Sequence, residues 1–128
     1  MPRIRVLQFS GAWGAPSIDA ECSKAQAWLR ICGLVPGIDY VVEDCNNPQV
    51  GQAGQLPVMH LGTKLAEPSE LYGALRDFGH DADAGLDPRQ RADSTAYEAL
   101  VTEQVGVALL YAWWVDADNY DVIRCAYA

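Results

Sequence analysis

The four cysteines, Cys22, Cys32, Cys45 and Cys125, are the residues of this sequence best suited to redox or metal chemistry. No two of them form a C-x-x-C pair, and their spacing matches no zinc or haem-attachment signature. Two lie in helical patterns and one at a strand end, where cysteine usually acts as a small hydrophobic residue. We therefore expect structural free thiols in a reducing compartment.

The other residue types that bind metals are also poorly placed. His60 and His80 have no second histidine or cysteine at ligand spacing. Residues 116–121 resemble the opening of a calcium loop, but the sixth position is not glycine and the twelfth, Tyr127, is not glutamate. Residues 81–85 are a weaker match. We expect both runs to form solvated acidic surface, and we expect neither a metal nor a cofactor.

The elements that would position these residues follow from hydrophobic periodicity. Alternating or short apolar runs predict strands at residues 4–9, 39–44, 56–61 and 64–66. Three- and four-residue spacing predicts one helix that begins at Ser17 or Asp19 and ends at Gly33, and another that begins at Glu67 or Ser69 and ends near Gly79. The first helix should bury four residues: Cys22, Ala25, Leu29 and Cys32. The connection 46–55 should be a loop or a short irregular helix.

The connections between these elements predict the topology of the sheet. A helical crossover joins the first two strands, so these strands should be parallel. The turn Gly62-Thr63 joins the last two strands in a tight hairpin, so these should be antiparallel. Leu56-Pro57 enters the third strand, where a cis peptide bond is favoured. The expected fold class is therefore α/β, with a mixed four-stranded sheet.

The second part of the chain has a helical pattern. Residues 81–87 form an acidic, glycine-containing linker, and Asp87-Pro88 has the signature of a helix start. Apolar residues then recur at helical spacing for about six turns, at Ala92, Ala96, Leu100, Val107 and Tyr111. We therefore divide the chain into a domain at 1–80, a linker at 81–87 and the start of a helical region at 88–128.

Composition excludes several classes of partner. The 128 residues suit one domain, and their 17 acidic against 9 basic side chains give a formal net charge of −8. Such a chain repels nucleic-acid phosphates and anionic lipid head groups. No apolar run approaches the roughly 20 residues needed to cross a bilayer. The N-terminus leads directly into a strand pattern and has no transit-peptide character.

The order of elements is similar to the thioredoxin-like half of glutathione transferases, with the long helix where their helical half begins. In that family a Ser, Tyr or Cys after the first strand polarises the glutathione thiol, a place that Ser10 or Ser17 would take here. A hydroxyl near a helix start is more often a cap. The family also binds glutathione through an acidic residue followed by serine, but here Pro68 follows Glu67. Since proline has neither a backbone N–H nor a hydroxyl, we expect no glutathione chemistry.

Adjacent tryptophans at Trp113 and Trp114 favour contact with further protein. They point about 100° apart on a helix, so one isolated helix cannot bury both against one sheet. One of them would pack on the thioredoxin-like half while the other meets other protein, or an exposed ring would anchor an interface. We assign a partner interface to these two residues together with Trp13 and Tyr120.

Three longer runs resemble the metaxin family. The first is GAWGAPSIDAECSKAQAWLRICGL at 11–34, with a Trp-Gly turn before a Pro-Ser-x-Asp helix start. The second is NNPQVGQAGQLPVM at 46–59, which ends in Leu-Pro-Val before the third strand. The third is RADSTAYEALVTEQVGVALLYAWWVDADNY at 91–120, which ends in a Trp-Trp-Val-Asp and Asn-Tyr pattern. Together these runs extend over nearly the whole chain.

The resemblance implies a non-enzymatic, glutathione-transferase-like protein at the mitochondrial outer membrane, facing the cytosol. Metaxins accompany the machinery that sorts and assembles β-barrel proteins, and some link mitochondria to transport adaptors. The expected partners are therefore protein subunits of a mitochondrial membrane complex, for which this chain would be a scaffold or adaptor without a cofactor.

Two alternatives remain open. Metaxins continue into a full helical domain, often with a C-terminal membrane anchor, whereas this sequence ends at Ala128 with about one and a half of the expected helices. Such an abbreviated form could serve as an accessory subunit of another mitochondrial complex, such as one of the respiratory chain. The second alternative is a minimal glutathione-transferase-like enzyme, which would have to function with Pro68 and without a C-x-x-C motif.

Overall fold

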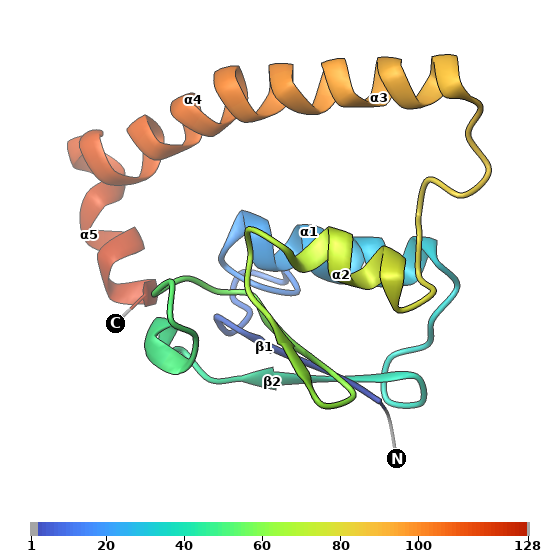
Figure 1. Ribbon diagram of the computed structural model, residues 1–128. Helices are drawn as coiled ribbons and strands as arrows, with labels where there is room; N and C mark the ends of the chain where they lie inside the picture. Colours follow the sequence, from blue (N-terminus) through green and yellow to red (C-terminus); the bar gives the residue numbers. More distant parts are fainter. Residues whose placement is uncertain (1–2, 128) are drawn as a thin grey trace. The chain divides into compact units, whose positions relative to one another are not determined.

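A computed structural model describes residues 3–127, which separate into two compact units between Ala82 and Asp83. The first unit contains a sheet with helices, and the second consists of helices (Figure 1). The boundary lies two residues after the predicted end of the first domain, within the segment predicted to be a linker.

Every strand and helix predicted for the first unit is present. In chain order they are β1 (Ile4–Gln8), α1 (Ala20–Ile31), β2 (Tyr40–Asp44), the 3₁₀ turn η1 (Pro48–Val50), β3 (Val58–Leu61), β4 (Lys64–Ala66) and α2 (Leu71–Asp77). Several are shorter than predicted, since Phe9, Asp39 and the pair Leu56-Pro57 lie outside the strands. Pro57 has no backbone N–H for a strand ladder, and its peptide bond with Leu56 is cis, at the position where the sequence favours one.

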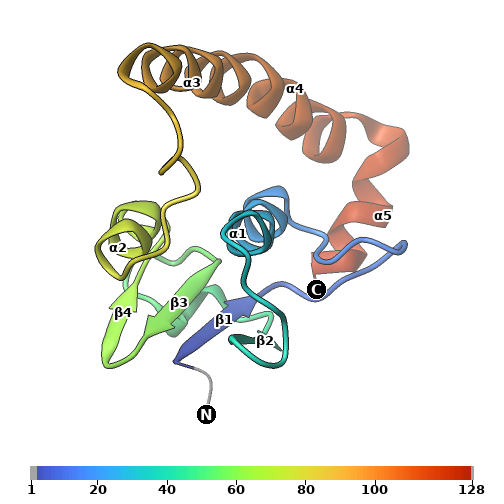
Figure 2. The same ribbon diagram turned by 90° about the vertical axis from the view of Figure 1, so that its right-hand side faces the viewer.

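The strands form a mixed sheet in the order β2-β1-β3-β4. β1 is parallel to β2, with Ile4 beside Tyr40, and antiparallel to β3, with Val6 beside Met59. β3 and β4 form the predicted hairpin. Helices α1 and α2 lie side by side on one face of this sheet (Figures 1 and 2). This is the thioredoxin-like arrangement that the element order predicts.

The core of the first unit lies between the sheet and these two helices. It joins aliphatic residues of the strands to those of α1 and α2 around the buried Tyr40, with Ile4, Val6, Ala25, Leu29, Met59, Leu61, Leu71 and Leu75. Asp19, rather than Ser17, caps α1 by accepting a hydrogen bond from the Cys22 backbone N–H. Cys32 is half-buried, not buried as predicted, because it is the last residue before the helix gives way to Gly33 at φ 84°.

The second unit departs from the single uniform helix that its spacing predicts. Its elements are α3 (Pro88–Leu100), the π-helical stretch η2 (Val101–Val105), α4 (Gly106–Leu110), a second π-helical stretch η3 (Tyr111–Val115), and α5 (Ala117–Tyr127). A capping box between Asp87 and Gln90 begins α3, with Pro88 in its first turn. Asp116, at φ −63° and ψ 119°, ends the run and separates α5. Among residues 3–127, no helix is long and apolar enough to cross a membrane.

Candidate functional site

Ser10 and Ser17 lie at the end of β1, where the sequence places a possible thiol-polarising hydroxyl. The Ser17 hydroxyl donates to the Phe9 carbonyl at 2.7 Å and accepts from the Asp19 backbone N–H at 3.1 Å. The Ser17 side chain is therefore buried and engaged in holding the turn before α1. Ser10 is held through its backbone, whose N–H donates to the Asn46 side chain at 2.9 Å and whose carbonyl accepts from the Ile18 N–H.

A buried network of amide side chains fills the space beside these serines. The Gln8 Nε2 donates to the Pro16 carbonyl and to Asp44 Oδ1, each at 3.0 Å. The Gln8 Oε1 accepts from the Gln26 Nε2 at 2.6 Å. Both glutamines are almost completely buried, and together they join β1, β2, α1 and the loop before α1. The arrangement fixes the end of β1 rather than opening it to a ligand.

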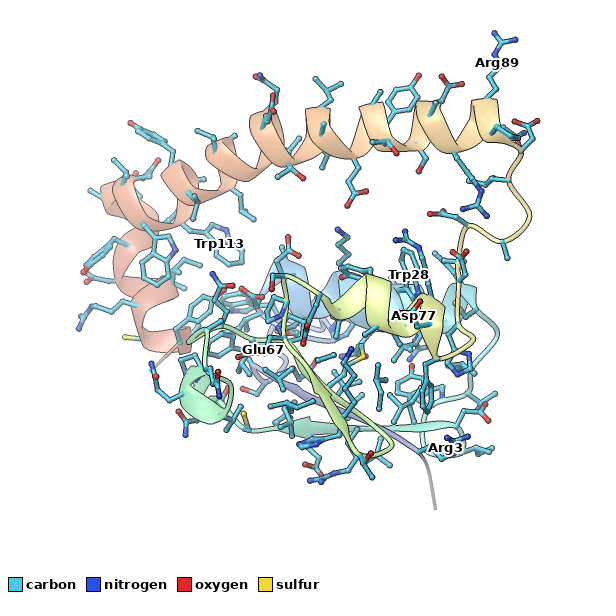
Figure 3. The ribbon with its side chains drawn as sticks, viewed as in Figure 1. Arg3, Trp28, Glu67, Asp77, Arg89 and Trp113 are labelled. Atoms are coloured by element: carbon cyan, nitrogen blue, oxygen red, sulfur yellow. The ribbon has the colours of Figure 1, made fainter. Side chains whose placement is uncertain are left out.

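Glu67, labelled in Figure 3, also has a structural partner. One of its carboxylate oxygens accepts from the Ala53 backbone N–H at 2.8 Å, which holds the loop after η1 against the end of β4. Gly51 passes so close to the same carboxylate that a Cβ at this position would clash with it. Because Pro68 follows Glu67, the next residue offers no backbone N–H, and the Glu67 side chain is occupied in the loop.

Cys22 is an inert thiol. It is fully buried at the start of α1, and burial raises the pKa of its thiol to about 12. Cysteine chemistry requires the thiolate, so this group is unreactive at neutral pH. Cys125, in contrast, is exposed on α5, while Cys32 and Cys45 are half-buried.

We predict that a thiol reagent such as DTNB labels Cys125 first and leaves Cys22 unlabelled until the protein unfolds. The raised pKa also gives a direction for stability. Above pH 8.5–9 the unfolded chain loses the Cys22 proton, whereas the folded protein keeps it until about pH 12. The stability that the buried thiol contributes is therefore complete below pH 8.5–9 and declines as the pH rises towards 12. Labelling kinetics measured with and without urea test the prediction, with Cys125→Ala as the control. Labelling of Cys22 at the rate of Cys125 in native buffer would contradict it.

Trp13 stands on a separate exposed turn of the first unit. The Ala15 N–H donates to the Ala12 carbonyl at 2.9 Å, and the two central residues, Trp13 and Gly14, have φ of 55° and 79°. Positive φ at both positions is typical of a type I′ turn, and it is unusual for a residue as large as tryptophan. The Trp13 side chain is 63% exposed, which leaves this ring available to a partner.

The helical unit presents large apolar side chains to solvent. Among the described residues of α3, η2, α4 and η3, none is buried. From residue 105 to residue 115 the sequence has no charged side chain. Val107, Leu110 and Tyr111 are each more than 60% exposed, and Trp114 is 39% exposed. Val107, Leu110 and Tyr111 have i, i+3, i+4 spacing, which places them along one side of the helix. Together with Trp114, which follows in η3, we call these residues the α4 face.

The predicted interface tryptophans of this unit form an aromatic cluster with α5. Trp113 and Trp114 both contact Tyr127, with ring centroids 6.1 and 5.4 Å away, and Trp114 also meets Tyr120 edge-on at 6.4 Å. Figure 3 shows Trp113 at the corner between α4 and α5. Both rings therefore have contacts within the helical unit, through a helix that the sequence pattern did not reveal.

Residues 116–121, which resemble the opening of a calcium loop, form the start of α5. Asp116 Oδ1 accepts from the Asp118 backbone N–H at 2.9 Å, and the Asn119 side chain donates to the Ala112 carbonyl at 2.9 Å. These bonds start α5 and tie it to the preceding helix. Within residues 3–127, no group of three His, Cys, Asp or Glu side chains could hold a metal ion.

The structure thus brings together three of the four predicted interface residues. Trp113, Trp114 and Tyr120 share one cluster, whereas Trp13 belongs to the other unit. Sequence reasoning did not identify Val107, Leu110 and Tyr111, the other residues of the α4 face, as interface candidates. Their helical spacing and the absence of charge around them were visible, but the same pattern is typical of a buried core helix.

Comparisons with known proteins show which family the chain is similar to. Residues 22–128 match the model of the Tom37 family, described as an outer mitochondrial membrane transport complex protein. Metaxin-1 of Mus musculus is 31% identical over 128 residues, which cover 98% of this chain and 39% of the mouse protein. Metaxin-3 of Danio rerio is 32% identical over 118 residues, 91% of this chain and 36% of the fish protein.

A third relative gives the same result. The Metaxin-1 homolog of Drosophila melanogaster is 31% identical over 114 residues, 88% of this chain and 34% of the fly protein. The chain spans less than two fifths of the length of these three relatives. The family model alone covers most of the chain, and the relatives cover nearly all of it. The chain therefore belongs to the Tom37/metaxin family, whose members are associated with the mitochondrial outer membrane.

Proposed function

We propose that this chain is a non-catalytic scaffold or adaptor subunit of an outer mitochondrial membrane transport complex, docked through the α4 face on the cytosolic side. The observation that carries the proposal is the row Val107, Leu110, Tyr111 and Trp114, exposed on a helix stretch without charge. Apolar anchors at this spacing suit the groove or helix surface of another protein. Such contiguous exposed apolar residues commonly mark interaction sites.

The state of the thioredoxin-like unit supports the non-catalytic part of the proposal. Ser17 and Glu67, two of the three residues that take the places of glutathione-site residues in the resemblance, are each engaged in hydrogen bonds that hold loops, and the third, Ser10, is held through its backbone. Cys22 is buried and protonated. A glutathione-dependent reaction would have to break these contacts before it could use the side chains. The same proposal includes the role that the metaxin resemblance implies, which is the sorting and assembly of outer-membrane β-barrel proteins.

The test is recovery of the tagged chain from mitochondria that are solubilised in a mild detergent and separated on a native gel. We expect the chain to migrate with a large complex whose other subunits are identified by mass spectrometry as outer-membrane transport proteins. Migration as a free monomer, or with an inner-membrane complex, would contradict the proposal. In a parallel assay the purified chain should neither bind immobilised glutathione nor conjugate it to a generic electrophile, and conjugation would refute the non-catalytic role.

A further inference from the structure

An open surface cavity of about 340 Å³, in which Arg3, Ile38 and Asp39 are exposed to solvent, lies in the first unit at the end of the sheet where β1 begins. Its apolar lining comes from Ile4, Leu34, Ile38 and Phe78, and Arg3 and Asp39 contribute opposite charges. Figure 3 shows Arg3 beside the start of β1. The site is therefore separate from Ser10 and Ser17, which follow the other end of this strand. Its volume is at the lower end of the range of small-molecule pockets, about 300–1,000 Å³.

Arg3 is held at the cavity by its backbone and by an aromatic ring. Its carbonyl accepts from the Gly62 N–H at 2.9 Å, which ties it to the β3–β4 hairpin. Its guanidinium lies 4.8 Å from the centroid of the Phe78 ring. No carboxylate of residues 3–127 lies within ion-pair distance of it. The cavity thus has a positive charge that pairs with no acidic side chain of the described residues.

Asp39 supplies the opposite charge from the loop before β2. One of its carboxylate oxygens accepts from the Val35 backbone N–H at 2.7 Å, which fixes the side chain on its own loop. Within the described part of the chain, Asp39 has no ion pair with a basic side chain. Two opposite charges therefore line the same cavity without pairing with each other.

We propose that this cavity binds a small zwitterion with an apolar body, of the class of apolar α-amino acids. The ligand carboxylate pairs with Arg3, its ammonium group pairs with Asp39, and its side chain packs on the apolar lining. An aromatic side chain fits best, because Phe78 and His80 already form a ring pair with centroids 5.8 Å apart. This ligand site lies in the first unit, so it is independent of the proposed docking through the α4 face.

The charge pattern selects a zwitterion over simpler ligands. An anion without an ammonium group would pair with Arg3 but would be repelled by Asp39. A cation without a carboxylate would pair with Asp39 but would be repelled by Arg3. A neutral apolar molecule would leave both charges without a partner while partly removing them from water. Only a ligand with both groups satisfies the two sides of the cavity at once.

The test is an NMR titration of the ¹⁵N-labelled full chain with three ligands that share one phenyl ring. L-Phenylalanine carries both charges, 3-phenylpropionate lacks the ammonium group, and 2-phenylethylamine lacks the carboxylate. We expect L-phenylalanine to shift amide signals of Ile4, Leu34, Ile38 and His80 with a dissociation constant on the order of 1 mM, as suits a ligand of this size. Each of the other two ligands should bind at least about tenfold more weakly, because it loses one charged contact.

Two substitutions connect the shifts to the cavity. Arg3→Gln removes the positive charge, and Asp39→Asn removes the negative charge but keeps an oxygen that can accept from Val35. Each should weaken L-phenylalanine binding about tenfold or more while the rest of the spectrum stays that of the folded protein. Arg5→Gln, a matched loss of charge on β1 outside the cavity lining, should leave binding unchanged. Absence of shifts at 20 mM ligand, equal binding of 3-phenylpropionate, or equal effects of the three substitutions would overturn the proposal.

Discussion

Replacement of both Leu110 and Tyr111 by serine should release the chain from its native complex and leave both of its units folded. Each of these side chains is 61% exposed, so its removal should change the free energy of unfolding little beyond the lower helix propensity of serine, about 0.5 kcal/mol per residue. At the centre of an interface, in contrast, a truncated apolar anchor typically costs 2 kcal/mol or more. The expected loss of affinity is therefore at least about 30-fold for each residue that acts as an anchor.

The measurement is the fraction of tagged chain in the high-mass band of a native gel, with circular dichroism of the purified variant to show that it is folded. A matched control is available on α3, where Tyr97 and Leu100 are the same residue types and are also exposed. The double change Tyr97→Ser and Leu100→Ser should leave incorporation unchanged. Full incorporation of the Leu110/Tyr111 variant, or an equal loss in the α3 control, would show that the α4 face is not the docking surface.

The adjacent tryptophans are less suitable for this test. Trp113 and Trp114 both contact Tyr127, so their replacement by alanine would loosen α5 as well as remove any contact with a partner. A loss of assembly in that variant would have two explanations. Leu110 and Tyr111 lie on exposed positions outside this aromatic cluster, and their replacement therefore separates docking from folding.

The parts of the fold that follow local rules could be predicted from the sequence. The β3–β4 hairpin follows from Gly62, which has φ of 64° in its turn, and the start of α3 follows from Asp87 and Pro88. The parallel pairing of β1 with β2 follows from the crossover helix, and the antiparallel pairing of β3 with β4 follows from this hairpin. In each case a few neighbouring residues determine the backbone, so no knowledge of distant contacts is needed.

The parts that depend on distant contacts or altered helix geometry could not be predicted. The two π-helical stretches shift the register of side chains, so a 3.6-residue pattern cannot place Trp114 relative to Leu110. Residues 116–121 resemble a metal loop, whereas Asp116 in fact ends one helix and accepts a bond at the start of the next. The cavity at Arg3 and Asp39 joins residues 36 positions apart through the sheet, and no local pattern indicates that they line one site.

The buried amide network at the end of β1 also depends on distant contacts, since Gln8 contacts Gln26 and Asp44, which are 18 and 36 residues away. In the sequence, Gln8 occupies an ordinary polar position in an alternating strand. Its 2% exposure shows that it instead fills the interior at the point where a ligand site would open. The hydrogen bonds of this network therefore help to hold this end of the thioredoxin-like unit closed.

Gln8→Leu should destabilise the first unit by about 3 kcal/mol. The change removes three hydrogen bonds and leaves the Gln26 amide and the Pro16 carbonyl without this partner, and a buried polar group without a partner costs about 1–3 kcal/mol. Urea denaturation followed by circular dichroism measures the effect as a lower midpoint with an unchanged slope. The exposed Gln52→Leu is the control and should shift stability by no more than about 0.5 kcal/mol.

The double variant Gln8→Leu and Gln26→Leu distinguishes lost hydrogen bonds from poor packing. If the cost of Gln8→Leu comes from the stranded Gln26 amide, removal of that amide should recover part of the lost stability, because two apolar side chains can replace a buried polar pair. Amide hydrogen exchange should also quicken in residues 10–18 of the single variant, since Gln8 holds this loop through the Pro16 carbonyl. A single variant as stable as the wild type, with unchanged exchange in the loop, would show that other contacts keep this end of the unit closed.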